Sequence, residues 1–428
     1  MQHHTVPRRH DVVVVGGGPI GIHVLSRLVE DGVVDAGAAA LVDPHDEVFA
    51  QWNTRAGNCR MPFLRSPASH GIDPDFRAIR RLASGEDQFT PPYHRPSVQL
   101  FRAHLENRWT SIADSVDRRR GTVSAIDRDG DDWVVTVSGG DSRDTLRTAA
   151  VVLAPGQPPP RMPVALSDMP VTAPVYHTHR DLLPEFAPGD RVAIVGGGIA
   201  AAHLATTLPE RHVIVDLWNR DRFTTWQFDS SPCFVGPRCG TLFREIADPW
   251  HRRDLIARSR RPGSVPADLN DALVRHRRNG QLRVISVELD AAAAAGRGVL
   301  LRGRSVAARG ARRPLAREYD AVIACTGFEP GPPAAELIAA LAAHSGLALA
   351  PDGYPVPRHD LSWAPGLFLA GALAELEVGP PARNLVGAHL AGRRIVPGVA
   401  RHLGAERDAR VTRARRPDGY VAPPGSQP

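Results

Sequence analysis

The sequence predicts an α/β fold in which one unit, a buried strand followed by a glycine-rich turn and a helix, occurs twice. The first copy is DVVVVGGGPIG and the second is RVAIVGGGIAA, 180 positions later. The apolar run that opens each copy is typical of a parallel strand buried on both faces. The pattern then becomes helical. Two such units in one chain predict two α/β domains.

The glycines of the first copy have separate roles in binding a dinucleotide. Gly16 permits the tight turn, Gly18 lets the backbone approach a pyrophosphate, and Gly21 lets helix and strand pack closely. Pro19 belongs to the same phosphate-binding turn, which opens a helix N-terminus. Asp43 ends the next apolar run, where its carboxylate can accept hydrogen bonds from a ribose diol. The alternative is a strand, turn and helix without a ligand.

The second copy differs from the first in the strand that follows its helix. Its small residues are Gly196, Gly198 and Ala201. The following strand ends in NRDR, and Arg220 or Arg222 can bind a 2′-phosphate that a carboxylate would repel. This pattern favours NADPH. Solvated surface charge is the alternative for both arginines, and Asp216 and Asp221 leave NADH open.

Composition limits the class of protein. A chain of 428 residues is long enough for two or more domains, and 43% hydrophobic with 23% charged residues is typical of a soluble globular protein. No apolar run is long enough to span a membrane, so we expect a cytoplasmic protein without a membrane partner.

The basic charge does not by itself indicate nucleic acid. The formal net charge is +6, but the arginines are interspersed with acids along the whole chain. We therefore expect no nucleic-acid partner. The chain contains no lysine, which excludes Schiff-base catalysis and a lysine base.

The cysteines and histidines indicate neither a redox dithiol nor a metal site. None of the cysteines forms a CxxC pair, and isolated buried thiols are expected at Cys59, Cys233, Cys239 and Cys325. His177 and His179 would share one face of a strand, but no third ligand accompanies them. We predict no metal.

The order of the elements predicts that the second domain is inserted into the first. An Asp-Gly hairpin precedes the buried strand AAVVLAPG, and the proline cluster after it marks a crossing between domains. The runs DAVIACTGF and GLFLAG are expected to return the chain to the first domain. The predicted parts are a first dinucleotide domain (1–160), an inserted second one (161–320), the rest of the first (321–403) and a flexible tail (404–428).

Several motifs, taken in order, resemble those of a known family. GGGPIG, LAPGQ, VGGGIAA, CTGF and GLFLAG are arranged as in flavin-dependent monooxygenases and reductases with two Rossmann-like dinucleotide domains. More narrowly, MPFLRSPASHGIDPD, RPSVQLF and ACTGFEP resemble the N-hydroxylating monooxygenases of lysine and ornithine. The resemblance covers roughly residues 10–400. It implies FAD at the first turn and NADPH at the second.

The resemblance also implies particular contacts. Gly156, Gly371, Thr326 and Gly327 would lie near a nucleotide, Trp52 would cap the flavin ring and Met61 would approach it. No catalytic residue is assigned; the candidates for contact with substrate or cofactor are Arg65, Ser66 and Asn384. Core packing is the alternative for Trp52, and a structural salt bridge is the alternative for Arg65.

The chain departs from the family at three points. The lysine and ornithine hydroxylases are expected to hold the substrate carboxylate with a lysine, so here an arginine substitutes or the substrate differs. Ala372 replaces the usual aspartate after Gly371, with Glu375 displaced from it. The Baeyer-Villiger fingerprint FxGxxxHxxxW is not met either: His177 can occupy its histidine position, but Asp181 stands where the aromatic residue belongs.

The implied function is N-hydroxylation of a small amine or amino acid by O₂ through a peroxyflavin intermediate, in siderophore or specialised metabolism. One alternative is an NAD(P)H-dependent flavin reductase or dehydrogenase that passes electrons to an acceptor without oxygen insertion. Another is a flavoprotein with a binding or regulatory role. The assembly is left open between a monomer and a homo-oligomer.

Overall fold

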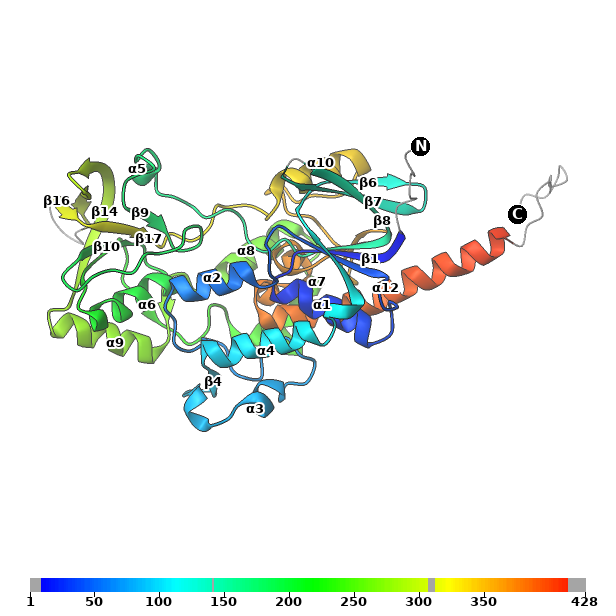
Figure 1. The fold of residues 1–428 in the computed structure, drawn as a ribbon, viewed down its shortest axis with the longest axis horizontal. Helices are drawn as coiled ribbons and strands as arrows, with labels where there is room; N and C mark the ends of the chain where they lie inside the picture. The colour runs from blue at the N-terminus through cyan, green and yellow to red at the C-terminus, as the bar shows by residue number, and fades with distance from the viewer. Residues whose placement is uncertain (1–8, 141, 307–311, 415–428) are drawn as a thin grey trace.

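The computed structural model describes residues 9–140, 142–306 and 312–414, and these form two large sheets (Figure 1). The first sheet has the order β18-β19-β8-β1-β2-β5, with β7 also paired to β8 and β6 to β7. Its strands are β1 (Arg9–Val15), β2 (Ala39–Asp43), β5 (Val116–Arg120), β6 (Thr122–Asp129), β7 (Asp132–Gly139), β8 (Ser142–Leu153), β18 (Ser362–Ala364) and β19 (Leu367–Leu369). β1 is central and pairs in parallel with both β2 and β8.

The second sheet has the order β16-β15-β14-β11-β10-β17-β9. Its strands are β9 (Val175–His177), β10 (Arg191–Val195), β11 (Ile214–Asn219), β14 (Leu282–Ala295), β15 (Gly298–Ser305), β16 (Pro314–Tyr319) and β17 (Ala321–Ala324). All of them lie in the sequence between β8 and β18, so the second sheet is built from an insertion into the first. The two sheets occupy opposite sides of the view in Figure 1.

Helices cover the sheets and connect them. They are α1 (Pro19–Glu30), α2 (Ala50–Asn58), α3 (Ala78–Leu82), α4 (Val98–Thr110), α5 (Val164–Ser167), α6 (Ile199–Thr207), α7 (Pro237–Glu245), α8 (Pro249–Ser259), α9 (Ala267–Arg278), α10 (Ala335–Ser345), α11 (Glu375–Val378) and α12 (Leu385–Ala414). Two short sheets complete the fold, β3 (Phe89–Thr90) with β4 (Arg95–Pro96), and β12 (Thr224–Thr225) with β13 (Ser264–Val265). None of the helices in these described ranges combines the length and apolar character needed to cross a bilayer.

The central strands are buried on both faces, as their apolar sequences predict. Along β10, Val192 and Ile194 pack into the core on the α6 side, while Ala193 and Val195 pack into a second core that contains Trp218. Because successive side chains of a strand point to opposite faces, a strand covered on both sides must be apolar throughout. This explains why the two glycine turns are preceded by unbroken apolar runs.

One local prediction is confirmed and one boundary is wrong. β6 and β7 form the expected antiparallel hairpin. β17, however, pairs with β10 and β9 in the second sheet. The chain therefore does not return to the first sheet at residue 321, but only at β18 and β19. A short apolar run shows that a strand is buried but does not identify its neighbours.

The predicted flexible tail is also partly wrong. Residues 404–414 continue α12, which packs on α1 and extends past the first sheet (Figure 1). Near its end Arg9 Nη2 donates to Glu406 Oε2 at 2.6 Å, which connects the helix to β1. The polar composition that suggested a tail is that of a helix with much of its surface in solvent. Residues 415–428 lie outside the described part of the chain.

Candidate active site

A cavity of about 990 Å³ opens against the first glycine turn, at the carboxyl ends of β1, β2 and β8. In α/β folds, ligands bind at this edge of the sheet. The inserted part contributes to the lining Ile199 and seven residues of the segment 228–236. Twelve of the predicted site residues line the cavity: Gly16, Gly18, Pro19, Gly21, Asp43, Trp52, Met61, Arg65, Ser66, Gly156, Gly371 and Asn384. The other predicted residues belong to the inserted part and lie outside this lining: Gly196, Gly198, Ala201, Arg220, Arg222, Thr326 and Gly327.

The first turn has the geometry that a bound phosphate requires. Gly16 has φ of +112°, and a Cβ there would lie 2.2 Å from the carbonyl oxygen of Ala154. A Cβ on Gly21 would lie 2.0 Å from the Gly16 oxygen, so helix and strand are in close contact. Gly18 is the N-cap of α1, forms no side-chain cap, and has open space where a Cβ would be. The free N–H groups at this helix end are therefore available to an anion.

Asp43 holds the turn and faces the cavity. Its Oδ2 accepts a hydrogen bond from the Gly17 N–H at 2.6 Å, and its Oδ1 accepts one from the His45 N–H at 3.0 Å. The side chain is 12% exposed. Its Oδ1 also lies 2.8 Å from His45 Nδ1, so the second lone pair of Oδ2 is the one that can still accept a bond from a ribose.

The second turn repeats this geometry in the inserted part. Gly196 has φ of +140°, and a Cβ there would lie 2.4 Å from the carbonyl oxygen of Cys325. Gly198 is the uncapped N-cap of α6 and again has open space at the Cβ position. Ala201 is fully buried, so its methyl fits where the first unit has Gly21. Both turns therefore fit a dinucleotide phosphate.

The end of β11 shows which side chains can reach a ligand of the second turn. Arg220 and Arg222 are exposed, and neither is paired with a described carboxylate. Asp216 is buried in the sheet, where its Oδ2 accepts a hydrogen bond from the Tyr319 hydroxyl at 2.8 Å. Asp216 is therefore removed from the nucleotide side of the strand. The amide of Asn219 occupies the position that Asp43 has in the first unit.

Sequence reasoning noted Asn219 without giving it a role. A Cβ on Gly197 would lie 2.4 Å from Asn219 Oδ1, just as one on Gly17 would lie 3.1 Å from Asp43 Oδ2. The signal was present in the sequence, because both residues end the strand that follows the glycine-turn helix. Matching the two units position by position would have found it.

Thr326 and Gly327 hold the segment after β17 against the segment around Arg161, where the chain crosses between the domains. Thr326 donates its hydroxyl to the carbonyl of Arg161, and the Gly327 carbonyl accepts from the Arg161 N–H at 3.0 Å. Thr326 Oγ1 also lies 3.4 Å from His177 Nε2. His179 stacks on Phe328 with ring centroids 4.7 Å apart. Within the described ranges, no group of three or more His, Cys, Asp or Glu side chains is arranged to hold a metal ion. That the protein binds no metal stays a prediction.

Hydrogen bonds within the protein hold two of the candidate substrate contacts, Arg65 and Asn384. Arg65 Nε donates to the Gln227 carbonyl at 2.7 Å, and its Nη2 donates to the Trp226 carbonyl and to Ser264. Its guanidinium thus connects the cavity wall to the inserted part. Its partners are neutral carbonyl and hydroxyl oxygens rather than the carboxylate that a structural salt bridge would have supplied. Asn384 Oδ1 accepts from the Gly387 N–H at 3.1 Å, which caps the start of α12.

The two predicted flavin-facing side chains are partly buried. Trp52 packs against Phe101, with ring centroids 5.1 Å apart, and also lines the cavity. Core packing, the alternative considered for Trp52, is thus observed, and its predicted position over a flavin ring stays a prediction. Met61 lies between the cores of the two parts and reaches the cavity.

Glu375 is the centre of an ion-pair network that the sequence did not predict. The residue is completely buried and is bound by Arg253 and Arg260 from the α8 region and by Arg383. Burial alone would raise its pKa, but the hydrogen bond and charge of Arg383, with the other guanidiniums, lower it to about 2. Glu375 does not line the cavity, so its carboxylate connects the inserted part to the first domain, while Arg383 and Ala372 line the cavity.

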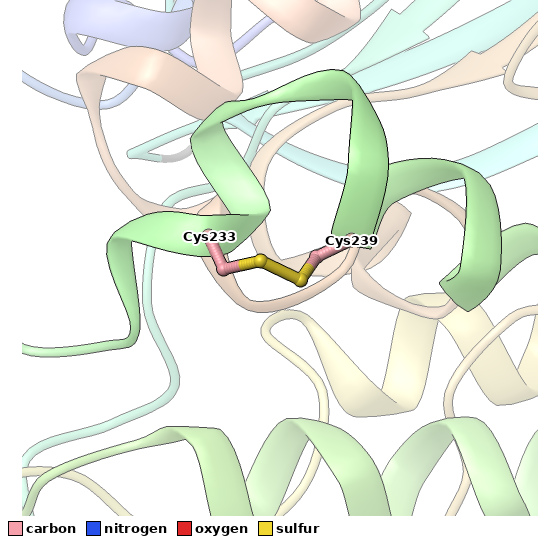
Figure 2. The surroundings of a disulfide bond; sticks show 2 residues. All are labelled: Cys233 and Cys239. Carbon is pink, nitrogen blue, oxygen red and sulfur yellow. A yellow bond between two sulfur atoms is a disulfide. The ribbon is translucent and has the colours of Figure 1, made fainter.

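A disulfide lies beside residues Pro232, Val235 and Gly236 of the cavity lining. Cys233, in a short helical turn (Pro232–Val235), is bonded to Cys239 in α7, with Cα atoms 5.5 Å apart (Figure 2). The expectation of isolated thiols is therefore wrong for this pair, because the chain turns back at Gly236, which sequence spacing does not reveal. Cys59 and Cys325 are buried free thiols, as expected, and burial raises the pKa of Cys59 to about 12.

Comparison with known proteins identifies the class to which this fold and site belong. The pyridine nucleotide-disulphide oxidoreductase family matches residues 10–393, and the chain belongs to that family. No curated protein matches the chain.

Solved structures show the same fold at low identity. The ornithine N-hydroxylase of Kutzneria sp. 744 is 18% identical with a TM-score of 0.72, covering 94% of this chain and 100% of its own. The cadaverine monooxygenase of the desferrioxamine pathway from Erwinia amylovora is 13% identical with a TM-score of 0.71, covering 92% and 94%. The bacillithiol disulfide reductase of Bacillus cereus is 15% identical with a TM-score of 0.59, covering 92% and 99%. The expected resemblance to N-hydroxylating monooxygenases is thus confirmed in the fold.

Proposed function

We propose that this chain is an FAD- and NADPH-dependent monooxygenase that N-hydroxylates a small amine or amino acid, in a siderophore or specialised-metabolite pathway. The observation that carries the proposal is the shared cavity. The first glycine turn lines this cavity, and so does Ile199 at the start of α6, directly after the second glycine turn. A cofactor on each turn would then reach the other across the cavity, which hydride transfer requires.

FAD reduced by NADPH supplies the activation of O₂ in such a site. The chain's own residues give the cavity an apolar lining, with Trp52, Met61, Phe228, Val235 and Leu337, and this lining would keep water from the flavin once the ligands are bound. We infer that this wall, rather than an acid-base group, is the main contribution of the protein to the chemistry.

One ionisable side chain in the cavity suits a neutral amine. His70 lines the cavity, and burial together with the nearby His389 lowers its pKa. Its imidazole is therefore neutral at pH 7 and can accept a hydrogen bond from an amine without adding positive charge.

The test begins with the purified protein. We expect FAD to be released on denaturation, and NADPH oxidation in air to produce a hydroxylamine from one member of a panel of diamines and basic amino acids. NADPH oxidation can be followed by absorbance and the hydroxylamine by colorimetry. If every amine leaves hydrogen peroxide as the sole product, the monooxygenase proposal fails. A chain that binds no flavin contradicts any flavin-dependent activity.

A second candidate function is a reductase that passes electrons to an acceptor without oxygen insertion. The observation in its favour is the Cys233–Cys239 disulfide, next to cavity-lining residues Pro232, Val235 and Gly236. Anaerobic titration with NADPH distinguishes the two functions. A monooxygenase takes up one NADPH for each FAD, whereas a reductase that also opens the disulfide takes up a second. The Cys233→Ser, Cys239→Ser double variant is the control, because it can take up only the first.

A further inference from the structure

Three arginines line the cavity, and two of them are already bound by the protein. Arg65 donates to carbonyl and hydroxyl oxygens of the inserted part. Arg383 donates to Glu375 through Nε at 2.7 Å and to the hydroxyl of Tyr354. Neither guanidinium is free to take a ligand without losing these bonds. Arg55 is the third arginine in the lining.

Arg55 has no counter-charge within the described residues. Its Nε is buried without a hydrogen-bond partner, and no described carboxylate is paired with the side chain. The Arg55 guanidinium lies over the ring of Phe328, with Cζ 4.9 Å from the ring centroid. Burial lowers its pKa to about 10, which still leaves the guanidinium charged at pH 7. A partly buried cation without a counter-charge is costly, so its presence in the cavity lining calls for a compensating partner.

The position of Arg55 connects the two nucleotide units. It lies on α2, whose start is held to the first turn by the bond from the Phe49 N–H to the Gly17 oxygen at 2.8 Å. Phe328, which it covers, follows β17 of the second sheet and stacks on His179. Arg55 therefore reaches from the first domain to the segment beside the second glycine turn.

We infer that Arg55 binds an oxyanion of a ligand in this cavity, either a phosphate of the nicotinamide dinucleotide or the carboxylate of an amino-acid substrate. The inference rests on the proposed function, because it requires a ligand in the cavity. Both groups accept two hydrogen bonds from one guanidinium. Since the chain has no lysine, and the other lining arginines are engaged, Arg55 is the side chain best suited to this role.

The experiment compares Arg55→Gln with Arg102→Gln in the FAD-loaded protein. Arg102 also touches α2, where its Nη2 donates to the Asn53 carbonyl at 3.1 Å, but it does not line the cavity. One arm measures the dissociation constant of NADP⁺ from the change in flavin fluorescence. The other measures the binding of L-ornithine against putrescine, which lacks the carboxylate. Arg55→Lys tests whether charge alone is sufficient.

The expected result is a loss of at least about tenfold in one arm for Arg55→Gln. A weaker NADP⁺ complex identifies the phosphate, and loss of the preference for ornithine identifies the carboxylate. Arg102→Gln should change neither, and Arg55→Lys should keep most of the affinity. The thermal midpoint without added ligand should not fall in Arg55→Gln, because no counter-charge is lost.

Wild-type affinity of Arg55→Gln in both arms overturns the inference, as does an equal loss in Arg102→Gln. A wild-type protein that retains neither FAD nor NADP⁺ contradicts the proposed function itself. The two failures are therefore distinguishable.

Discussion

The two glycine turns share one backbone design but differ in the residue that supports them. In the first unit a Cβ on Gly16 would meet the carbonyl of Ala154, and in the second a Cβ on Gly196 would meet the carbonyl of Cys325. Both turns open a helix without a side-chain cap. The supporting side chain is the carboxylate of Asp43 in the first unit and a neutral amide in the second. Backbone packing thus sets the shape of the turn. We propose that the residues at the end of the neighbouring strand select the nucleotide.

This difference supports unequal assignments for the two turns. The carboxylate of Asp43 suits an unmodified ribose diol and would repel a 2′-phosphate. The second unit has Asn219 at that position, followed by the exposed Arg220 and Arg222. FAD at the first turn and NADPH at the second is therefore the assignment that we propose. Substitutions made in pairs, one in each unit, can test it.

The largest effect is expected when the tight turn itself is changed. Gly16→Ala should destabilise the fold by about 3 kcal/mol or more, because it combines a positive φ with a Cβ 2.2 Å from a carbonyl oxygen. Gly196→Ala should do the same in the inserted part. Thermal and denaturant unfolding measure both. A variant as stable as wild type would show that the turn can rearrange and is not fixed by strand packing.

A smaller and more selective effect is expected at the helix N-caps. Gly18 and Gly198 have open space at the Cβ position, so neither Gly18→Ala nor Gly198→Ala should reduce the stability of the ligand-free chain by more than about 1 kcal/mol. If a pyrophosphate approaches each backbone, Gly18→Ala should weaken FAD and Gly198→Ala should weaken NADP⁺, each by roughly thirtyfold. Loss of the same cofactor in both variants would contradict the assignment.

The third prediction concerns the arginines after β11. Replacing both Arg220 and Arg222 by Gln should reduce the ratio of kcat/KM for NADPH over NADH by about tenfold, because a charge-assisted contact to the 2′-phosphate is lost. Arg211→Gln is the control, since Arg211 is exposed but paired with Glu185. An unchanged ratio in the double variant would favour the alternative of solvated surface charge.

The smallest effect is expected when the second unit is converted toward the first. Asn219→Asp keeps the shape of the side chain but places a carboxylate beside Gly197, as Asp43 does beside Gly17. The preference for NADPH should fall by roughly fivefold, corresponding to about 1 kcal/mol of repulsion. Steady-state kinetics with both nucleotides provide the measurement. A stronger NADPH preference would show that residue 219 does not face the ribose.

Local patterns in the sequence predicted local structure well. The apolar run and glycines of each unit predicted a strand, a turn and a helix, and the structure has all three at both places. The hairpin β6–β7 was equally clear from its alternation around an Asp-Gly turn. These features depend on residues adjacent in the chain, so the sequence contains the relevant information.

Pairing between distant segments could not be predicted in the same way. Buried strands look alike whichever sheet they join, so β17 was assigned to the first sheet, although it pairs with β10. The Cys233–Cys239 bond depends on a reversal of the chain at Gly236 rather than on a known spacing motif. Glu375 was noted as a displaced flavin contact, but its partners Arg253 and Arg260 are more than a hundred positions away.

The sequence by itself determined that this chain contains two dinucleotide-type turns, because glycine is required wherever a Cβ would collide with the neighbouring backbone. It also determined that the strand after the second turn ends in NRDR, with two arginines, where the strand after the first turn ends in Asp43. Only the tertiary structure decided which cations in the cavity are free. Arg55, Arg65 and Arg383 are the same type of residue in the sequence. Whether each guanidinium can bind a ligand depends on the carbonyls and carboxylates that folding brings to it from other parts of the chain.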